Sequence, residues 1–588
     1  MLQFLKYVLA TFVGLFLFIF ISIFLLAGIG AMFSSDEKVA VAEKSVLRLD
    51  LNKPIQEVGV ENPFAEIGGP FGGGENVVGL NDILDALKSA KEDKNINGIF
   101  LKTEGPQTGW AMLEEIRNQL LDFKKSGKFI VAYGESYSEK GYYVASVADK
   151  IYLNPAGGME WNGISAEYQF FKGTFDKLGI KPEVFRVGEF KSAIEMFSRQ
   201  DMSEASKKQS SELIAAINGN FLKNISSSRK IPVEELKSLA DSLGLEDPQS
   251  ALKHKFVTNL GYWDEFEASV KKDLKLDDKK EISYVGIDKY LKSDTKKEEG
   301  DFNKRVAVIV AEGEIHSGES GDESIGSETF VKALKKARDD DKIKAIVLRI
   351  NSPGGSALAS DVMWREIQIT SKKKPVIASM SDVAASGGYY MAMGCDTIVA
   401  QPNTITGSIG IFGLIFNVTD FMNNKLGITF DGVGTSPHAD WPTATRDMTD
   451  FEKSRIQQSV NQGYANFTTK AAAGRKMPVE KLRSMSQGRV WSGIEAKENG
   501  LVDVLGGIED AVKIAAKSAK LKEGDYRVRY YPEKKKPLEE IFDKIMGDSE
   551  DKVMTEKLGE LATYAKMYQK IVNMGGMQAR MPFELVIR

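Results

Sequence analysis

One serine of this chain lies among small residues in a way that suits a nucleophile. Ser386 occupies the run Ala-Ala-Ser-Gly-Gly, soon after an apolar stretch that begins at Val376 and has the pattern of a buried strand. Small neighbours leave a hydroxyl accessible at a sharp turn from strand to helix, and the glycines allow a substrate carbonyl to approach the backbone. The alternative interpretation of this run is an ordinary tight turn.

A second glycine turn lies upstream of the serine. Gly354 and Gly355 end the run Asn-Ser-Pro-Gly-Gly, which follows the apolar stretch 345–350. Two turns of this kind can aim backbone N–H groups at one point, as is needed to stabilise an oxyanion. Alone, this turn is also compatible with a purely structural role. Two strand-to-turn elements in this order, with a serine in the second, favour a hydrolase.

A serine hydroxyl is a weak nucleophile at neutral pH and needs a base within hydrogen-bond reach. The chain has three histidines, His254, His316 and His438, and the last shares a loop with Asp440, which leaves a Ser-His-Asp triad open. A lysine can serve instead if an apolar site lowers its pKa from about 10.4. Lys191 is a candidate because its neighbours in the sequence are largely apolar, although a surface lysine is the alternative interpretation.

Three motifs carry a resemblance to a known family. They are Ser-Pro-Gly-Gly at 352–355, Ser-Asp-Val-Ala-Ala-Ser-Gly-Gly-Tyr-Tyr at 381–390 and Gly-Ser-Ile-Gly at 407–410. Together they resemble the signal peptide peptidase SppA family (protease IV, peptidase family S49) of the ClpP/crotonase superfamily. The resemblance extends over most of the chain and is closest to the long form with a duplicated domain.

The resemblance implies a serine peptidase with a Ser/Lys dyad. Ser386 would be the nucleophile, and Lys191, in the matching run Gly-Glu-Phe-Lys-Ser-Ala, would be the general base and acid. The backbone N–H groups of Gly387 and Gly355 would form the oxyanion hole. Ser408 would orient the lysine amine, the alternative being a turn or helix-capping serine. The family implies no metal and no organic cofactor.

The same resemblance implies partners and a location. The substrates would be hydrophobic peptides, in particular signal peptides left in the membrane after secretory processing. The protein would be a homo-oligomer, with a tetramer expected. It would be a single-pass protein of the bacterial inner (cytoplasmic) membrane, with its catalytic domains on the periplasmic side.

Composition and charge exclude other classes. The formal net charge is −4, and no basic cluster with interleaved aromatic residues is present, so nucleic acid is not an expected partner. Cys395 is the only cysteine, which excludes an intrachain disulfide and a cysteine-rich metal site. Its place in an apolar run predicts a small core residue.

An internal repeat indicates a duplicated domain. Residues 100–106 (FLKTEGP) resemble residues 347–353 (VLRINSP) at an offset of 247. At this offset Ser386 faces Glu139, so the first half lacks the nucleophile. The second half, in turn, has no counterpart of Lys191. This complementary loss predicts one active site assembled from both halves.

Strand and helix patterns alternate along both halves. Strands are expected at 45–51, 96–102, 128–133, 305–315 and 343–350, and helices at 81–91, 110–124, 330–339 and 357–369. This alternation favours βα units on a largely parallel sheet. The predicted fold is α/β, with tandem ClpP/crotonase-like domains preceded by an N-terminal transmembrane helix.

The predicted domain boundaries follow composition. They are an anchor at 1–35, a first half carrying the lysine at 36–291, a charged linker at 292–304, a second half carrying the serine at 305–525 and a helical tail at 526–588. Residues 7–33 contain no charge and are long enough to span a bilayer as a helix, the alternative being a buried soluble helix. The tail is expected to form a helix over 538–574 and a short strand over 581–588.

Two other functions remain open from the sequence. A crotonase-like acyl-CoA enzyme would also use paired backbone amides, but it would not need the Ser/Lys pair. A membrane-anchored scaffold could keep the fold without catalysis. The presence of both Ser386 and Lys191 favours the peptidase.

Overall fold

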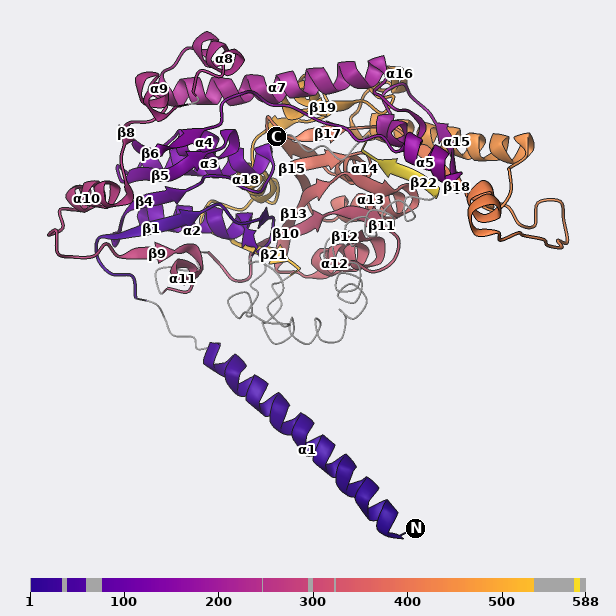
Figure 1. Cartoon of the computed structure of the whole chain (residues 1–588), viewed down its shortest axis with the longest axis horizontal. Helices are drawn as coiled ribbons and strands as arrows, with labels where there is room; N and C mark the ends of the chain where they lie inside the picture. The colour runs from indigo at the N-terminus through magenta and orange to yellow at the C-terminus, as the bar shows by residue number, and fades with distance from the viewer. Residues whose placement is uncertain are drawn as a thin grey trace.

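The computed structural model describes residues 2–33, 40–59, 77–245, 247–293, 300–321, 324–532 and 576–581 of the 588-residue chain. In Figure 1 the two halves lie side by side, each as a sheet with helices packed against it. The helix α7 (Glu204–Arg229) runs along the top of both halves. The backbone N–H of Val490 in the second half donates to Gln209 of α7 over 2.9 Å, so this helix joins the halves.

The first half is built on a parallel sheet with the strand order β8-β6-β5-β4-β1-β9. Its strands are β1 (Ser45–Asp50), β4 (Ile96–Lys102), β5 (Phe129–Tyr137), β6 (Lys150–Met159), β8 (Asn259–Leu260) and β9 (Tyr284–Gly286). The helices α2 (Leu80–Glu92) and α3 (Trp110–Lys124) bury their apolar faces. The strands and helices predicted here from periodicity are confirmed.

The second half repeats this plan. Its main sheet has the order β19-β17-β15-β13-β10-β21, with β16 beside β15 and β20 beside β16, and only the β17–β19 pair is antiparallel. The elements are β10 (Arg305–Glu312), α12 (Ser327–Asp339), β13 (Ile343–Ser352), α13 (Ala357–Ser371), β15 (Val376–Ala385), β16 (Thr397–Ala400), β17 (Ile405–Gly407), β19 (Val490–Ser492), β20 (Val504–Leu505) and β21 (Arg527–Tyr531). The predicted α/β class with largely parallel sheets is confirmed.

A third sheet joins segments that are far apart in the sequence. Its order is β12-β11-β14-β22-β18-β7. The strands are β7 (Lys181–Arg186), β11 (Glu314–His316), β12 (Ser324–Gly326), β14 (Gly354–Ser356), β18 (Phe412–Asn417) and β22 (Gly576–Arg580). β7 comes from the first half and β22 from the C-terminal tail, whereas the other four belong to the second half. The chain segment after β7 is therefore held against the second half.

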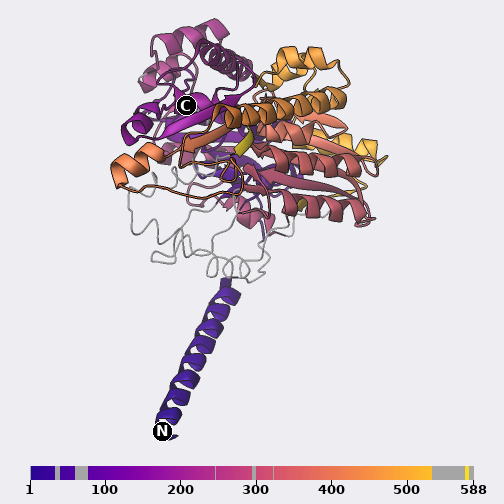
Figure 2. The same ribbon diagram turned by 90° about the vertical axis from the view of Figure 1, so that its right-hand side faces the viewer.

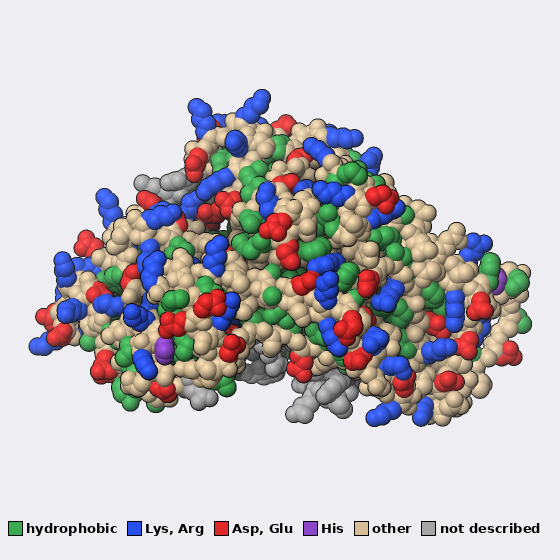
Figure 3. Space-filling view, turned by 90° about the horizontal axis from the view of Figure 1, so that it is seen from above, with side chains coloured by type: hydrophobic (Ala, Val, Ile, Leu, Met, Phe, Trp, Pro, Cys, Tyr) green, Lys and Arg blue, Asp and Glu red, His purple; other side chains and the backbone are tan. Residues whose placement is uncertain are grey.

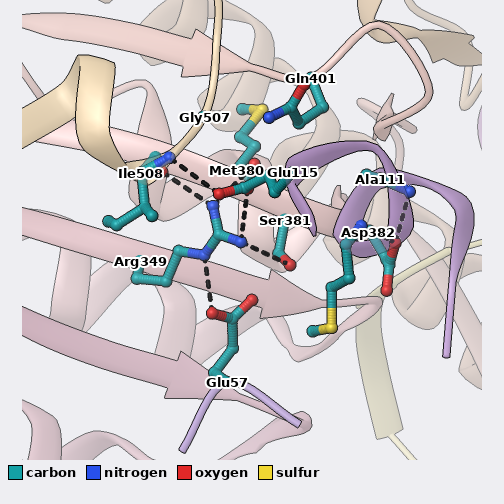
Figure 4. Close-up of polar contacts among 12 residues, drawn as sticks. Glu57, Ala111, Glu115, Arg349, Met380, Ser381, Asp382, Gln401, Gly507 and Ile508 are labelled. Carbon is teal, nitrogen blue, oxygen red and sulfur yellow. Dashed lines mark hydrogen bonds and ion pairs between the residues drawn. The ribbon is translucent and has the colours of Figure 1, made fainter. Parts of the chain in front are cut away.

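A cluster of buried charged side chains lies at the interface between the two halves (Figure 4). Arg349 of β13 is fully buried and pairs with Glu57 and Glu115 of the first half, at 2.8 and 2.7 Å. Asp382 of β15 accepts the backbone N–H groups at the start of α3, including that of Ala111 at 2.8 Å. Charged groups that are this deeply buried are costly unless they are paired, so the halves are matched to each other here.

The N-terminal helix α1 (Leu2–Phe33) stands away from the rest of the chain in both ribbon views (Figure 2). Within the described ranges, no helix has both the length and the apolar character that crossing a membrane requires. The membrane-spanning helix predicted over 7–33 is thus not confirmed. The helix expected over 538–574 lies outside the described residues. So does the strand expected over 581–588, apart from Met581, and β22 ends just before it.

The surface and the single cysteine agree with the composition. On the face drawn in Figure 3, acidic and basic side chains are interspersed rather than gathered by sign. Cys395 is buried, as its apolar surroundings in the sequence predict.

Candidate active site

Ser386 forms the sharp turn between β15 and α14 (Gly387–Ala392). Its φ of 56° lies in the left-handed region, which a residue with a side chain adopts only when its surroundings enforce it. The backbone N–H donates to the carbonyl of Gly407 over 2.8 Å, and the residue is fully buried. The strand-to-helix turn predicted for this serine is present, and it fixes where the hydroxyl points.

Lys191 reaches the serine from the first half of the same chain. It follows β7, which pairs antiparallel with β18, and precedes the short 3-10 helix η1 (Ser192–Ile194). The Nζ atom lies 2.9 Å from Ser386 Oγ, 2.9 Å from Ser408 Oγ and 3.0 Å from the Ser408 carbonyl oxygen. The structure therefore brings together the predicted serine, lysine and second serine, although 195 residues separate the first two.

Two glycines hold the segment that carries the lysine. Gly488 has a φ of 81°, and a Cβ atom placed on it would lie 2.7 Å from Cβ of Lys191. Gly188 has a φ of 101° and packs against the backbone of Gln487, whose carbonyl accepts the N–H of Phe190 at 3.0 Å. Neither glycine stands out in the sequence, because the close approach they permit is between segments far apart in the chain.

The surroundings of Lys191 favour a neutral amine. Its side chain is fully buried, and burial lowers its pKa well below the ordinary value. A neutral amine has two N–H groups and one lone pair. The carbonyl oxygen of Ser408 can only accept, and the Ser408 hydroxyl can take the second N–H, so the lone pair is left to face Ser386 Oγ. This arrangement can remove the proton of the Ser386 hydroxyl.

Ser408 is itself fixed by the backbone. It follows β17, is fully buried and has a φ of 51°. Its N–H donates to the carbonyl of Arg489 over 2.7 Å. A serine held in this way can orient an amine, whereas it caps none of the described helices.

The two glycine turns meet beside the nucleophile. Gly354, with a φ of 99°, lies so close to Gly387 that a Cβ placed on it would be 2.7 Å from the Gly387 nitrogen. The N–H of Gly354 donates to Ser352 Oγ over 3.2 Å, which leaves the amides of Gly355 and Gly387 as the predicted oxyanion donors. Gly354 was not predicted as a site residue, yet only glycine permits this approach.

Each of the three histidines has another partner. His254 contacts Glu235 at 3.0 Å, and His316 contacts Ser324 at 2.9 Å. His438 Nδ1 lies 2.9 Å from a carboxylate oxygen of Glu452. His438 therefore contacts Glu452, whereas Ser386 contacts Lys191, and the structure does not form the alternative Ser-His-Asp triad.

The corresponding turn of the first half has a different role. Glu139, which faces Ser386 at the offset of 247, is the first residue of α4 (Glu139–Ala145), whereas Ser386 directly precedes α14. Its carboxylate accepts the backbone N–H groups of Asn162 and Gly163, at 3.1 and 2.9 Å, and Lys140 Nζ donates to the Thr108 carbonyl over 2.9 Å. These contacts tie loops together and include no nucleophile.

Comparison with known proteins agrees with this arrangement. A family model described as Peptidase family S49 matches the chain twice, over residues 122–277 and 368–522. The chain is 39% identical to Protease 4 of Salmonella typhi over 477 residues, which cover 80% of this chain and 76% of that protein. It is 35% identical to the chloroplastic serine protease SPPA of Arabidopsis thaliana over 449 residues, 75% of this chain and 66% of that protein.

Among solved structures, a ClpP1 mutant from Listeria monocytogenes aligns with a TM-score of 0.24 and 16% identity, over 35% of this chain and 94% of that one. The chain belongs to peptidase family S49, in the long form with the family domain present twice, and it is a serine peptidase.

Proposed function

We propose that this peptidase works through a Ser/Lys dyad formed by Ser386 and Lys191. The observation that carries the proposal is the 2.9 Å contact between Ser386 Oγ and Nζ of a lysine that is fully buried. Desolvation makes this lysine a base at pH values where an exposed lysine is charged. The acyl-CoA alternative gives no reason for a buried lysine against the serine.

The proposed reaction is hydrolysis through an acyl-enzyme. Lys191 takes the proton of the Ser386 hydroxyl as Oγ attacks the peptide carbonyl, and the amides of Gly355 and Gly387 stabilise the oxyanion. The C–N bond then breaks, and the leaving amine takes the proton from Lys191. Water, deprotonated by the same lysine, attacks the ester and releases the acid, and Ser386 recovers its proton. Ser408 keeps the amine directed at Oγ throughout.

The test uses the full chain and a fluorogenic hydrophobic peptide. The parent is expected to hydrolyse the peptide and to be acylated at Ser386 by a fluorophosphonate. Ser386→Ala should lose both activities, with kcat reduced by at least about 10³-fold. Ser146→Ala is the matched control, since it removes the hydroxyl of a buried serine that lies in the first half and donates to the Tyr143 carbonyl. Equal hydrolysis by the parent and Ser386→Ala would refute the assignment.

We also propose that the substrates are hydrophobic peptides, such as signal peptides that remain in the membrane after secretory processing. Residues 7–33 would anchor the enzyme in the same bilayer, on the side where those peptides remain. The absence of charge between Lys6 and Asp36 supports this proposal. Membranes from producing cells should retain the full chain after alkaline carbonate extraction and should release a variant that lacks residues 2–33. Release of both forms would overturn the anchor.

A further inference from the structure

The C-terminal strand β22 occupies a slot inside the third sheet. It is antiparallel to β14 on one side and to β18 on the other, and Figure 1 draws it in yellow next to β18. β14 carries the glycine turn, and β18 is the strand against which the lysine-bearing segment is held. A segment from the end of the chain thus forms a strand within the site built by the two halves.

The register of β22 places one carbonyl at the proposed oxyanion hole. Met581 N–H donates to the Pro353 carbonyl over 2.6 Å. Hydrogen-bonded pairs recur at every second residue of an antiparallel ladder, so Gly355 and Ala579, which are partners in the register, form the next such pair. The carbonyl oxygen of Ala579 therefore faces the N–H of Gly355.

The same oxygen is close to both other glycines of the site. A Cβ placed on Gly354 would lie 2.1 Å from the Ala579 oxygen, and one placed on Gly387 would lie 3.1 Å from it. The Ala579 carbonyl is thus at the place where the carbonyl of a substrate would be polarised, beside Ser386. The peptide bond between Ala579 and Arg580 occupies the position of a scissile bond.

The side chains of the segment fit their surroundings. Ala579 is fully buried, so a small side chain fills the space next to the nucleophile. Arg580 is 6% exposed and pairs with Glu314 of β11 at 2.8 Å. Met577, which pairs with β18 but lies beyond the residues that pair with β14, is 43% exposed.

We propose that Gly576–Met581 is a tethered, substrate-like occupant of the peptide groove, and that it inhibits the enzyme until an extended peptide replaces it by strand addition between β14 and β18. The proposal rests on the proposed Ser/Lys function for its inhibitory effect. Tethering keeps the local concentration of the segment high, so it competes effectively with free peptide. A substrate bound in the same register would need a small residue in the place of Ala579.

A disulfide lock tests this placement and its effect in the full chain. Ser356 and Gln578 are partners in the register and fall between two hydrogen-bonded pairs, where Cα atoms are about 4.5 Å apart, within disulfide range. Ser356→Cys/Gln578→Cys should form this bond on oxidation, whereas Cys395 is buried and should not compete. The oxidised protein should hydrolyse peptide and react with fluorophosphonate at least roughly tenfold more slowly than the same protein after reduction.

The control is Gln578→Cys alone, whose activity oxidation should leave unchanged. Failure of the double variant to crosslink, or equal activity when oxidised and reduced, would overturn the proposal. If the bond forms but Ser386 is unreactive in the parent and in every reduced sample, the proposed Ser/Lys function fails, and inhibition fails with it. The crosslink yield would still report the placement of the strand.

Reversing the charge of Arg580 should weaken the inhibition that the disulfide lock strengthens. Arg580→Glu faces Glu314 with a like charge, so the segment should leave the groove more often and KM for the peptide should fall. Combining it with Glu314→Arg restores opposite charges and should return KM towards that of the parent. An unchanged or higher KM in Arg580→Glu would contradict the inhibition.

Discussion

Replacing Lys191 by methionine is expected to lower kcat by roughly 10³- to 10⁶-fold while the protein stays folded. The methionine side chain is of similar length and needs no hydrogen-bond partner, so it can fill the buried space. What it lacks is the lone pair that accepts the Ser386 proton. The measurement is single-turnover hydrolysis of the hydrophobic peptide, beside a far-UV circular dichroism spectrum. Activity within tenfold of the parent would mean that another group is the base.

The pH dependence provides a second readout of Lys191. Since burial lowers its pKa, the activity of the parent should rise with pH through that lowered pKa and fall as the amine becomes protonated below it. In the unfolded chain the same lysine binds its proton up to about pH 10.4, so the unfolded state binds more protons between the two values and stability rises with pH there. Lys191→Met removes this dependence and should be at least as stable as the parent at neutral pH.

Lys191→Arg separates charge from chemistry. A guanidinium cannot be deprotonated in this range, so the variant should be inactive at every pH and should also be destabilised by its buried charge. If Lys191→Arg keeps activity that rises with pH on the acidic side of the profile, as in the parent, a group other than Lys191 causes that rise.

Replacing Arg349 by methionine is expected to destabilise the protein by about 3–5 kcal/mol. The guanidinium is fully buried between Glu57 and Glu115 (Figure 4). It also donates to Ser379 and Ser381, at 3.0 and 3.1 Å. Its removal leaves two buried carboxylates without their cation. Urea unfolding of the full chain in detergent measures the effect. The loss should be smaller at pH 5 than at pH 8, because burial raises the pKa of Glu115, and this carboxyl group can take up a proton at the lower pH once its cation is removed.

Two further variants distinguish the loss of the buried ion pairs from the effect of replacing any arginine by methionine. Arg199→Met removes an exposed arginine paired with Asp201 at 2.8 Å and should cost at most about 1 kcal/mol. Adding Glu57→Gln and Glu115→Gln to Arg349→Met should recover most of the stability, since the two carboxylates that paired with the guanidinium are then replaced by neutral amides. If the triple variant is no more stable than Arg349→Met, the cost does not come from stranded charge.

The sequence around this cluster contains a local sign of it. Arg349 is the only charged residue within the run 345–350, which is otherwise apolar. A charge in a buried strand requires a partner, so an arginine at this position indicates that an acidic group packs against the second half there. It could not identify Glu57 or Glu115, because the partners lie hundreds of residues away and no local pattern marks them.

The sequence by itself determined the elements and the nature of the chemistry. Local periodicity sets strands and helices, and the predicted ranges match β4, α3 and β13 closely because burial on a sheet imposes its period on each segment. Small residues around Ser386 mark a turn that bulky residues could not form. The repeat marks the duplication, since the two copies keep a common spacing, and the opposite losses in the copies pointed to one shared site.

Only the tertiary structure decided how the site is assembled. The contact between Lys191 and Ser386 requires β7 to cross to β18, and a pairing between strands of different halves depends on long-range packing that local patterns do not encode. The same holds for Gly488, whose role exists only because the lysine segment packs against it. It holds most of all for β22, a tail strand whose partner in the sheet is the glycine turn of the site itself. The hydrogen bonds between β22 and β14 are made by backbone groups that every residue has, so no pattern of side chains predicts this pairing.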